Sequence, residues 1–492
     1  MQSFNIQKAN QFITDNKDKV NKKHRPNFHY AAPVGWMNDP NGFSFFNGQY
    51  HLFYQYYPYD SQWGPMHWGH ATSDDCIKWE DQKIALAPDH EYDQGGCFSG
   101  SAIEKDGKLY LMYTGHLPDS NEENTRQNQN IAYSEDGITF KKYEKNPVLT
   151  ENDIPEGSSI IDFRDPKIFE KDGIYYAVIG SKTIDNKGQV LLYQSEDLLE
   201  WSFVSIILPY NKYLGTMVEC PDFLSIGGKD YFILSAMDYT DEESGEIFPH
   251  ISWIVEGKLN WETYTFTLNN IKELDRGFDF YAPQSVKKGD SYYLISWMQS
   301  WNKSMPMHDY QHGWAGQMTL PRNVYYENGM LKQQVSKEIY KYFENKFAND
   351  NLEVIDEYCV SDKKIEYLSL ELDYSSLKEF KIKFSNSNNE ELYIIHDHES
   401  QSFYIDRGNN TYKINNQKDI SLSKSRRSLP YNTNILKIEL FIDTSSVEVF
   451  INDEETLTAT FYTETPYNKS WLLTNGKLKV NRLRGANINL SR

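Results

Sequence analysis

The 492-residue chain has few cysteines, and their spacing matches neither a zinc finger nor a disulfide framework. The four are Cys76, Cys97, Cys220 and Cys359, without a Cys-x-x-Cys pair. In a chain of this size, scattered cysteines are typical of free thiols in a reducing compartment. Residues 1–6 also lack the charged and apolar regions of a secretory signal. A cytoplasmic location is therefore expected.

Long apolar runs and an excess of basic residues are also missing. No stretch approaches the roughly 18 apolar residues of a membrane helix. The formal net charge at pH 7 is −20, which argues against nucleic acid or an anionic membrane surface as a partner. We therefore expect no nucleic-acid partner and no membrane partner, while a local basic pocket stays compatible with this charge.

The chain is rich in aromatic side chains. They make up 15% of its residues, with 36 tyrosines. Such side chains favour β-sheets, and their flat faces suit stacking against sugar rings. Because 492 residues exceed one ordinary core, we expect two domains or one large repeat architecture.

A glycine followed within three residues by an aromatic-rich strand recurs five times. The marker glycines lie 55 to 66 residues apart and are Gly48, Gly107, Gly173, Gly228 and Gly289. A second marker, a serine followed by an acid, repeats every 61 residues, at Ser73, Ser134 and Ser195. A period near 60 residues that holds short strands and no long helix is typical of one four-stranded propeller blade. The repeat therefore predicts a five-bladed β-propeller over residues 27–331.

The segments that flank the repeat differ from it in pattern. Residues 1–26 are expected to form a helical extension, since apolar residues recur at helical spacing from 4 to 20. The charged residues 332–346 resemble a helix, so residues 332–349 are predicted to be a helical linker. Alternating runs follow, and they predict a C-terminal antiparallel β-sandwich over residues 350–492. The predicted fold class is all-β, a five-bladed β-propeller followed by this sandwich.

One residue stands eight or nine positions before each marker glycine. These five residues are Asp39, Ser99, Asp165, Glu219 and Tyr281. Equivalent positions in successive blades are related by rotation, so we expect all five at one end of the central channel. Three of them are acids at or beside an X-Pro step, and Asp39 lies within the turn sequence Asn-Asp-Pro-Asn-Gly.

Acids that face one another across a channel have pKa values pushed apart by repulsion and desolvation, which favours one acid and one base at neutral pH. Independent turns that face solvent are the competing interpretation. A cation site is the other, but calcium loops place several oxygens close in sequence. Neighbouring residues favour a sugar instead. Stacking faces are offered by Trp36, Trp63, Phe98, Trp297 and Trp301, and hydroxyl partners by Asn38, Gln55, Ser99 and Arg164.

Four short segments together resemble the signature segments of glycoside hydrolase family 32, the β-fructofuranosidases. They are Trp-Met-Asn-Asp-Pro-Asn-Gly at 36–42, Phe-Ser-Gly-Ser at 98–101, Arg-Asp-Pro at 164–166 and Glu-Cys-Pro at 219–221. The resemblance extends to residues 68–73 and 446–450. It implies a five-bladed propeller plus a β-sandwich, in agreement with the repeat.

The resemblance also implies roles for the three acids. Asp39 is expected to be the nucleophile, Glu219 the general acid and base, and Asp165 the stabiliser of the transition state, with retention and without a metal or organic cofactor. Arg164 is expected to hold the adjacent Asp165 ionised. The residues implied to line the fructose pocket are Asn38, Gln55, Trp63, Phe98, Ser99, Arg164 and Tyr281.

Within the family, residues 25–30 and 63–68 are most similar to intracellular sucrose-6-phosphate hydrolases. A 6-phosphate on glucose would need basic residues at the rim. The candidates in the last-blade region are Lys303, His308, His312 and Arg322, for which ordinary exposed loop positions are the default interpretation. The expected substrates are sucrose and sucrose 6-phosphate.

Three alternatives stay open at the level of the sequence. They are an intracellular exo-fructanase acting on short inulin- or levan-type oligosaccharides, a five-bladed arabinan-type glycosidase, and a non-catalytic sugar-binding propeller. The C-terminal sandwich is expected to act as an interface in a homo-oligomer, as a substrate wall or as a stabilising cap.

Overall fold

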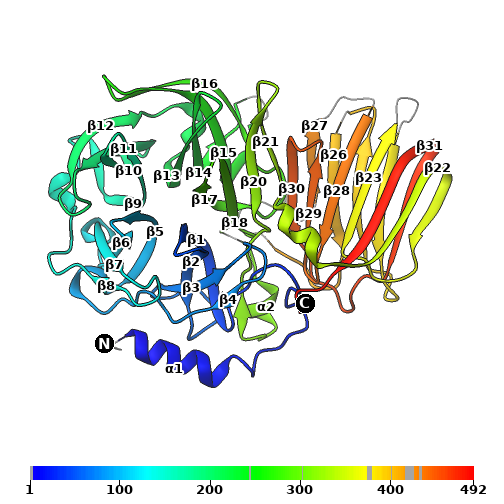
Figure 1. The fold of residues 1–492 in the computed structure, drawn as a ribbon, viewed down its shortest axis with the longest axis horizontal. Coiled ribbons are helices and arrows are strands. Elements are labelled where there is room, and N and C mark those ends of the chain that lie inside the picture. The colour runs from blue at the N-terminus through cyan, green and yellow to red at the C-terminus, as the bar shows by residue number, and fades with distance from the viewer. Residues whose placement is uncertain are drawn as a thin grey trace.

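Strands dominate the computed structural model, which describes residues 4–242, 245–301, 303–373, 379–400, 402–415, 426–430 and 435–491. They form two bodies, a propeller ring and a C-terminal β-domain beside it (Figure 1). Within the described part of the chain, no helix combines the length and the apolar character needed to cross a membrane.

Five sheets form the ring and confirm the predicted propeller. The first contains β1 (Gly35–Phe46), β2 (Gln49–Tyr57), β3 (His67–Ser73) and β4 (Glu80–Asp81). The second contains β5 (Gly96–Lys105), β6 (Lys108–Leu117), β7 (Arg126–Ser134) and β8 (Lys141–Lys142). The third contains β9 (Ser158–Lys171), β10 (Ile174–Thr183), β11 (Gly188–Ser195) and β12 (Ser202–Leu208).

The fourth blade contains β13 (Met217–Ile226), β14 (Lys229–Thr240), β15 (Ile247–Asn260) and β16 (Thr265–Glu273). The fifth contains β17 (Tyr281–Lys288), β18 (Ser291–Trp297), β20 (Arg322–Glu327) and β21 (Met330–Val335). The short strand β19 (Trp314–Ala315) leaves the fifth blade and pairs in parallel with β1. This pairing links the last blade to the first.

Each marker glycine lies in the tight turn between the first two strands of its blade. All five have positive φ, between 61° and 83°. Glycine reaches this region without a Cβ clash, and two-residue hairpins require it. The sequence marker therefore identifies the same hairpin in every blade.

The first strand of every blade carries a β-bulge, and each bulge lies at the residue that the spacing singled out. The register shifts between Met37 and Pro40, between Phe98 and Gly100, between Arg164 and Lys167, between Glu219 and Asp222, and between Tyr281 and Gln284. A bulge bends its strand and redirects a side chain, and bulges are common next to active sites. Neighbouring first strands contact each other around the ring, so the five bulges surround one channel.

The predicted N-terminal helix forms as α1 (Ile6–Asn16) and lies along the edge of the ring (Figure 1). The Asn5 side chain caps it by accepting a hydrogen bond from the Lys8 backbone N–H at 2.8 Å. Ala9 is fully buried, and the Asn10 side chain accepts a bond from the Ile84 backbone N–H at 3.0 Å. These contacts fasten the helix to the first blade.

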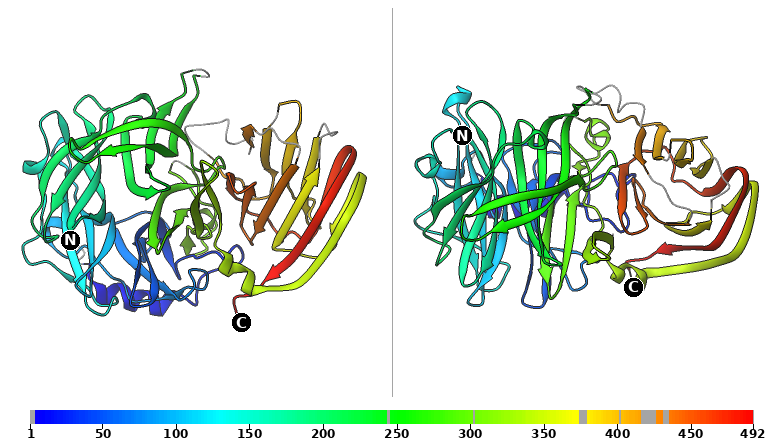
Figure 2. Two further views of the ribbon diagram at one scale, coloured as in Figure 1. Left: turned by 45° about the horizontal axis from the view of Figure 1, so that its top comes forward. Right: turned by 90° about the horizontal axis from the view of Figure 1, so that it is seen from above.

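The C-terminal domain is the predicted antiparallel sandwich. Its strands are β22 (Phe343–Ser361), β23 (Tyr367–Asp373), β24 (Glu379–Ser385), β25 (Glu391–Asp397), β26 (Ser402–Asn409), β27 (Arg426–Pro430), β28 (Ile435–Ile442), β29 (Ser446–Ile451), β30 (Glu455–Thr460) and β31 (Lys469–Ile488). The first half of β31 pairs with β24 and its second half with β23, so β31 belongs to both layers. Figure 2 shows β22 and β31 curving together along one side of the domain.

The helical linker predicted over residues 332–349 is wrong. Strand β21 continues to Val335, a short 3-10 helix spans Lys337–Tyr342, and β22 begins at Phe343. The reason is tertiary, because Tyr325 pairs with Lys332 and Arg322 with Val335 across the fifth blade. Sheet pairing outweighs the helix propensity of charged residues here.

Buried ion pairs join the propeller to the sandwich. Arg322 in β20 donates to Glu448 in β29 at 2.7 Å and to Asp275 at 2.9 Å. His29 lies between Asp443, 2.9 Å away, and Glu448, 3.0 Å away, with all three side chains fully buried. Charges removed from water are retained only when paired, so these contacts hold the two domains in one arrangement.

Candidate active site

The three predicted acids come together at one end of the channel. Asp39 lies on β1, Asp165 on β9 and Glu219 on β13, and all three line one cavity of about 620 Å³. The other residues that line it are Asn38, Gln55, Trp63, Phe98, Ser99, His116, Glu122, Glu123, Thr125, Gln127, Ile161, Asp162, Arg164, Lys182 and Trp301.

Asp39 is held by donors from its own strand and from the second and fourth blades. The Asn38 side-chain amide donates to Oδ1 at 3.0 Å, and the Ser99 hydroxyl donates to Oδ2 at 2.9 Å. The Cys220 thiol lies 3.6 Å from Oδ2. Burial, together with repulsion from Glu219, raises the pKa of Asp39. The hydrogen bonds from these donors offset part of that rise. One carboxylate is thus fixed in position by several partners.

Asp165 occupies the bulge of β9 with a left-handed φ of 65°. Its Oδ2 accepts a hydrogen bond from the Cys220 backbone N–H at 3.0 Å, and its own N–H donates to the Thr114 hydroxyl at 2.9 Å. Non-glycine residues rarely adopt this conformation, and here strands from the second and fourth blades hold it in place. The conformation turns the Asp165 carboxylate toward the fourth blade.

Glu219 accepts bonds from two side chains. The Arg164 guanidinium donates to Oε1 at 3.0 and 3.2 Å, and the Tyr281 hydroxyl donates to Oε2 at 2.7 Å. Burial raises the pKa of the Tyr281 phenol well above its usual range, so the phenol stays a donor. Both carboxylate oxygens are therefore oriented.

Arg164 does not act on Asp165 as expected. It pairs with Asp162 at 2.6 Å and with Glu219, whereas its nearest approach to Asp165 is 3.9 Å. Burial raises the pKa of Asp165 to about 7, which outweighs the lowering by Arg164. The arginine holds Glu219 rather than keeping Asp165 ionised.

Aromatic side chains form the walls of the cavity. Trp63 is 46% exposed and meets the edge of Phe98, with ring centroids 6.0 Å apart. Phe98 stacks on His116 at 4.3 Å, and Trp301 stacks on Trp36 at 6.0 Å. A sugar ring can stack on this exposed aromatic wall while its glycosidic bond lies at the paired carboxylates.

Both parts of the chain match models of one protein family, and named relatives cover most of its length. Residues 29–335 match the "Glycosyl hydrolases family 32 N-terminal domain", and residues 331–486 match the "Glycosyl hydrolases family 32 C terminal". A sucrose-6-phosphate hydrolase from Escherichia coli is 38% identical over 435 residues, 87% of each chain. A raffinose invertase from the same species is 37% identical over 450 residues, 89% of each chain.

The chain belongs to glycosyl hydrolases family 32. Among solved structures, a variant of the family 32 β-fructofuranosidase of Bombyx mori in complex with sucrose is similar, with a TM-score of 0.83 and 30% identity over 98% of both chains. The family resemblance in the short sequence segments is confirmed.

Within this family 32 chain, most of the predicted pocket residues line the cavity. The exception is Tyr281, which is buried behind Glu219 and is 1% exposed. Trp297, suggested as a stacking face, is likewise fully buried. Tyr281 therefore reaches the cavity only through its hydrogen bond to Glu219.

Eight further residues that line the cavity carry no signal in the sequence patterns described above. They are His116, Glu122, Glu123, Thr125, Gln127, Ile161, Asp162 and Lys182. Several lie in the connection between β6 and β7, which returns to the same end of the propeller as the start of β5. The position of this connection after the second strand of a predicted blade was a signal for Glu122, Glu123 and Thr125.

The four candidates for a phosphate contact are not among the residues that line the cavity. Lys303 pairs with Asp279 at 3.0 Å. Arg322 is buried between the two domains, and His312 stacks on His24. His308, in α2 (Pro306–Asp309), bonds with Ser61 at 2.8 Å. Their positions serve the packing of the fold, which loop sequence alone did not reveal.

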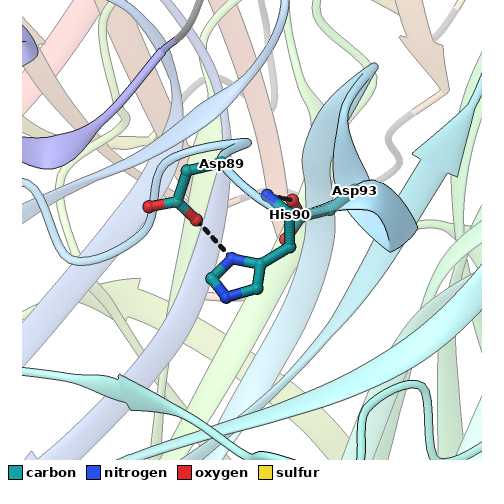
Figure 3. A group of neighbouring side chains, drawn as sticks. All are labelled: Asp89, His90 and Asp93. Carbon is teal, nitrogen blue, oxygen red and sulfur yellow. Dashed lines mark hydrogen bonds and ion pairs between the residues drawn. The ribbon is translucent and has the colours of Figure 1, made fainter.

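Figure 3 shows Asp89, His90 and Asp93, whose potential ligand atoms lie close enough for a metal ion. The Lys142 ammonium lies 2.6 Å from Asp89 and 2.6 Å from Asp93. It also donates to the Ala87 carbonyl at 2.7 Å. A protein cation already balances these acids, so this group supports the second blade.

Proposed function

We propose that the protein hydrolyses the fructosyl bond of sucrose and sucrose 6-phosphate with retention of configuration. The observation that carries the proposal is the convergence of Asp39, Asp165 and Glu219 in one aromatic-walled cavity. The names of the Escherichia coli relatives and the sucrose complex of the Bombyx mori enzyme support this substrate class.

In the first step, Asp39 attacks the anomeric carbon of the fructosyl unit. Glu219, in its protonated form, gives its proton to the glycosidic oxygen, and the bond to the leaving sugar breaks. A fructosyl ester of Asp39 forms. Asp165 is assigned to the hydroxyl groups of the fructosyl ring, whose developing positive charge it stabilises.

In the second step, the Glu219 carboxylate takes a proton from water. The water oxygen bonds to the anomeric carbon, the ester bond breaks, and Asp39 is released as a carboxylate. Two displacements at one carbon give net retention. Arg164 and Tyr281 keep Glu219 oriented through both of its roles.

A non-catalytic sugar-binding propeller does not need Asp39 and Glu219, two carboxylates held by hydrogen bonds, next to Asp165, whose pKa is raised. An exo-fructanase is the nearer alternative, and relative rates on sucrose and short inulin-type oligosaccharides would distinguish the two.

The proposal includes a cytoplasmic location, supported by four cysteines that form no disulfide. The homo-oligomer expected through the sandwich stays a prediction, which light scattering tests.

The test is fructose release from sucrose by the wild type and by two substituted forms. Asp39→Asn and Glu219→Gln should each lower kcat by about a thousandfold or more, since each removes a group that makes or breaks a bond. Circular dichroism and Tm should stay close to wild type.

Asp172→Asn is the matched control, because its side chain is 83% exposed on the hairpin that follows β9. It should leave kcat unchanged. Near-normal turnover by either active-site variant would refute the assigned roles, and NMR detection of an inverted fructose anomer would refute the two-step mechanism.

A further inference from the structure

The outer part of the active-site cavity carries mostly negative charge. Beyond the three acids on its floor, the acidic residues that line it are Asp162, Glu122 and Glu123. Among the described residues that line it, the side chains charged positively at neutral pH are Arg164 and Lys182. His116 adds no positive charge, since burial lowers its pKa to about 4.

Both cations already have carboxylate partners. Lys182 Nζ lies 2.8 Å from Asp162 Oδ2, and Arg164 Nη1 lies 2.6 Å from Asp162 Oδ1. Arg164 is also bonded to Glu219. An anion that recruited either cation would leave a mostly buried carboxylate without its partner, which is costly.

Glu122 and Glu123 are held at the cavity mouth by their own turn. They belong to a 3-10 turn, Glu122–Asn124, between β6 and β7, and the Asn121 side chain accepts from the Glu123 backbone N–H. Arg126 donates to the backbone carbonyls of Glu123 and Thr125 at 2.7 and 2.8 Å. The guanidinium thus braces the backbone, and both glutamate side chains stay exposed toward the cavity.

From this charge arrangement we infer that the cavity selects against a phosphorylated leaving group. Sucrose and other uncharged fructosides are then better substrates than sucrose 6-phosphate. A phosphate monoester carries about −1.5 to −2 charges at pH 7, and like charges repel over about 10 Å at moderate salt. This inference rests on the proposed fructosidase function and specifies its substrate class.

The first test compares kcat/KM on the two sugars for the wild-type protein. Sucrose should be favoured by about tenfold or more at low ionic strength, and added salt should narrow the ratio, because ions screen the repulsion. Equal or higher kcat/KM on sucrose 6-phosphate overturns the inference and leaves the proposed function intact. Cleavage of neither sugar overturns the proposed function itself.

The second test removes the two charges at the mouth. In the double variant Glu122→Gln/Glu123→Gln, the ratio of kcat/KM on sucrose 6-phosphate to that on sucrose should rise about three- to tenfold at low ionic strength. The matched control is Glu196→Gln/Glu200→Gln, two exposed glutamates between β11 and β12 that are not among the residues lining the cavity.

The control should keep the wild-type ratio. An unchanged ratio in the cavity variant, with a wild-type circular dichroism spectrum, contradicts the role of these glutamates. If the cavity variant does not fold, the salt dependence of the wild-type ratio decides, and a ratio that does not respond to salt refutes the inference.

Discussion

At the level of single residues, the charge of the Asp39 carboxyl depends on a balance between burial and a few hydrogen-bond donors. Burial raises the pKa of its carboxyl, while the donors from Asn38, Ser99 and Cys220 lower it. Ser99 comes from the neighbouring blade, so its hydroxyl is delivered by β5 rather than by the strand that carries Asp39. A nucleophile must be ionised to attack, which makes this bond functionally measurable.

We predict that Ser99→Ala moves the acidic limb of the pH profile of kcat/KM to higher pH. Loss of the donor raises the pKa of Asp39 further, so Asp39 becomes ionised only at higher pH. The limb should move by about one pH unit, because a hydrogen bond to a charged group contributes about 1.5 kcal/mol. Such profiles report groups of the free enzyme. Ser225→Ala, at an exposed position near the far end of β13, is the control and should keep the limb in place. An unmoved limb in Ser99→Ala contradicts the prediction.

At the scale of elements, the bulges of the first strands determine where the site residues point. The bulge of β5 is held at Gly100, whose carbonyl accepts a hydrogen bond from the Gln284 side-chain amide at 2.9 Å. The strand also passes very close to β6. A Cβ on Gly100 would lie 2.0 Å from the Met112 carbonyl oxygen, so only glycine fits at this point.

Gly100→Ala is therefore expected to displace β5 and with it Ser99. We predict a fall in kcat/KM of about tenfold to a hundredfold, since misplacement by about 1 Å is enough for such losses. Gly107→Ala is the matched control, because its Cβ would meet open space. Its φ of 73° still costs about 1–2 kcal/mol of stability, but activity should be that of the wild type. Equal activity in the two variants would count against the bulge as the positioning element.

At the scale of the whole molecule, the buried ions between the propeller and the sandwich make stability depend on pH. Burial alone lowers the pKa of His29, but Asp443 and Glu448 raise it to about 9. Burial alone raises the pKa of Asp443, but His29 and backbone donors lower it to about 2. These opposite shifts belong to one buried group of charges.

The signs of the two shifts define a window of greatest stability. His29 gains protons on folding, so its contribution is complete below its ordinary pKa of 6.5 and is lost as the pH rises through about 9. The contribution of Asp443 is complete above its ordinary pKa of 3.8 and is lost as the pH falls toward about 2. Denaturant unfolding should therefore show this part of the stability at its fullest between about pH 4 and 6.5.

We predict that His29→Gln lowers the free energy of unfolding by about 3–5 kcal/mol near pH 6, because two buried carboxylates lose their shared cation. The loss should shrink toward pH 9, where the wild-type ring is itself losing its proton. His90→Gln is the control, since His90 is an exposed histidine paired with Asp89 and such pairs contribute about 0–1 kcal/mol. A loss in His29→Gln that does not vary with pH would show that packing, and not charge, is responsible.

Local sequence patterns were enough to predict the repeat, the hairpins and the position of the site residues relative to the marker glycines. Glycine at a tight turn and alternation along a strand are local requirements, so Gly48 and its four equivalents marked the blades, and Asp39, Asp165 and Glu219 followed from their distance to them. The strands of the sandwich were readable for the same reason.

Other features depend on contacts between segments that are distant in the sequence. Strand β21 formed where charged residues suggested a helix, because β20 lies beside it and offers backbone partners. Arg164 turned to Glu219 and Asp162, 55 and two positions away, rather than to the adjacent Asp165. Lys303 and Arg322 were drawn into buried ion pairs at the domain junction. Side-chain pairing and burial follow from three-dimensional packing, which local sequence patterns do not encode.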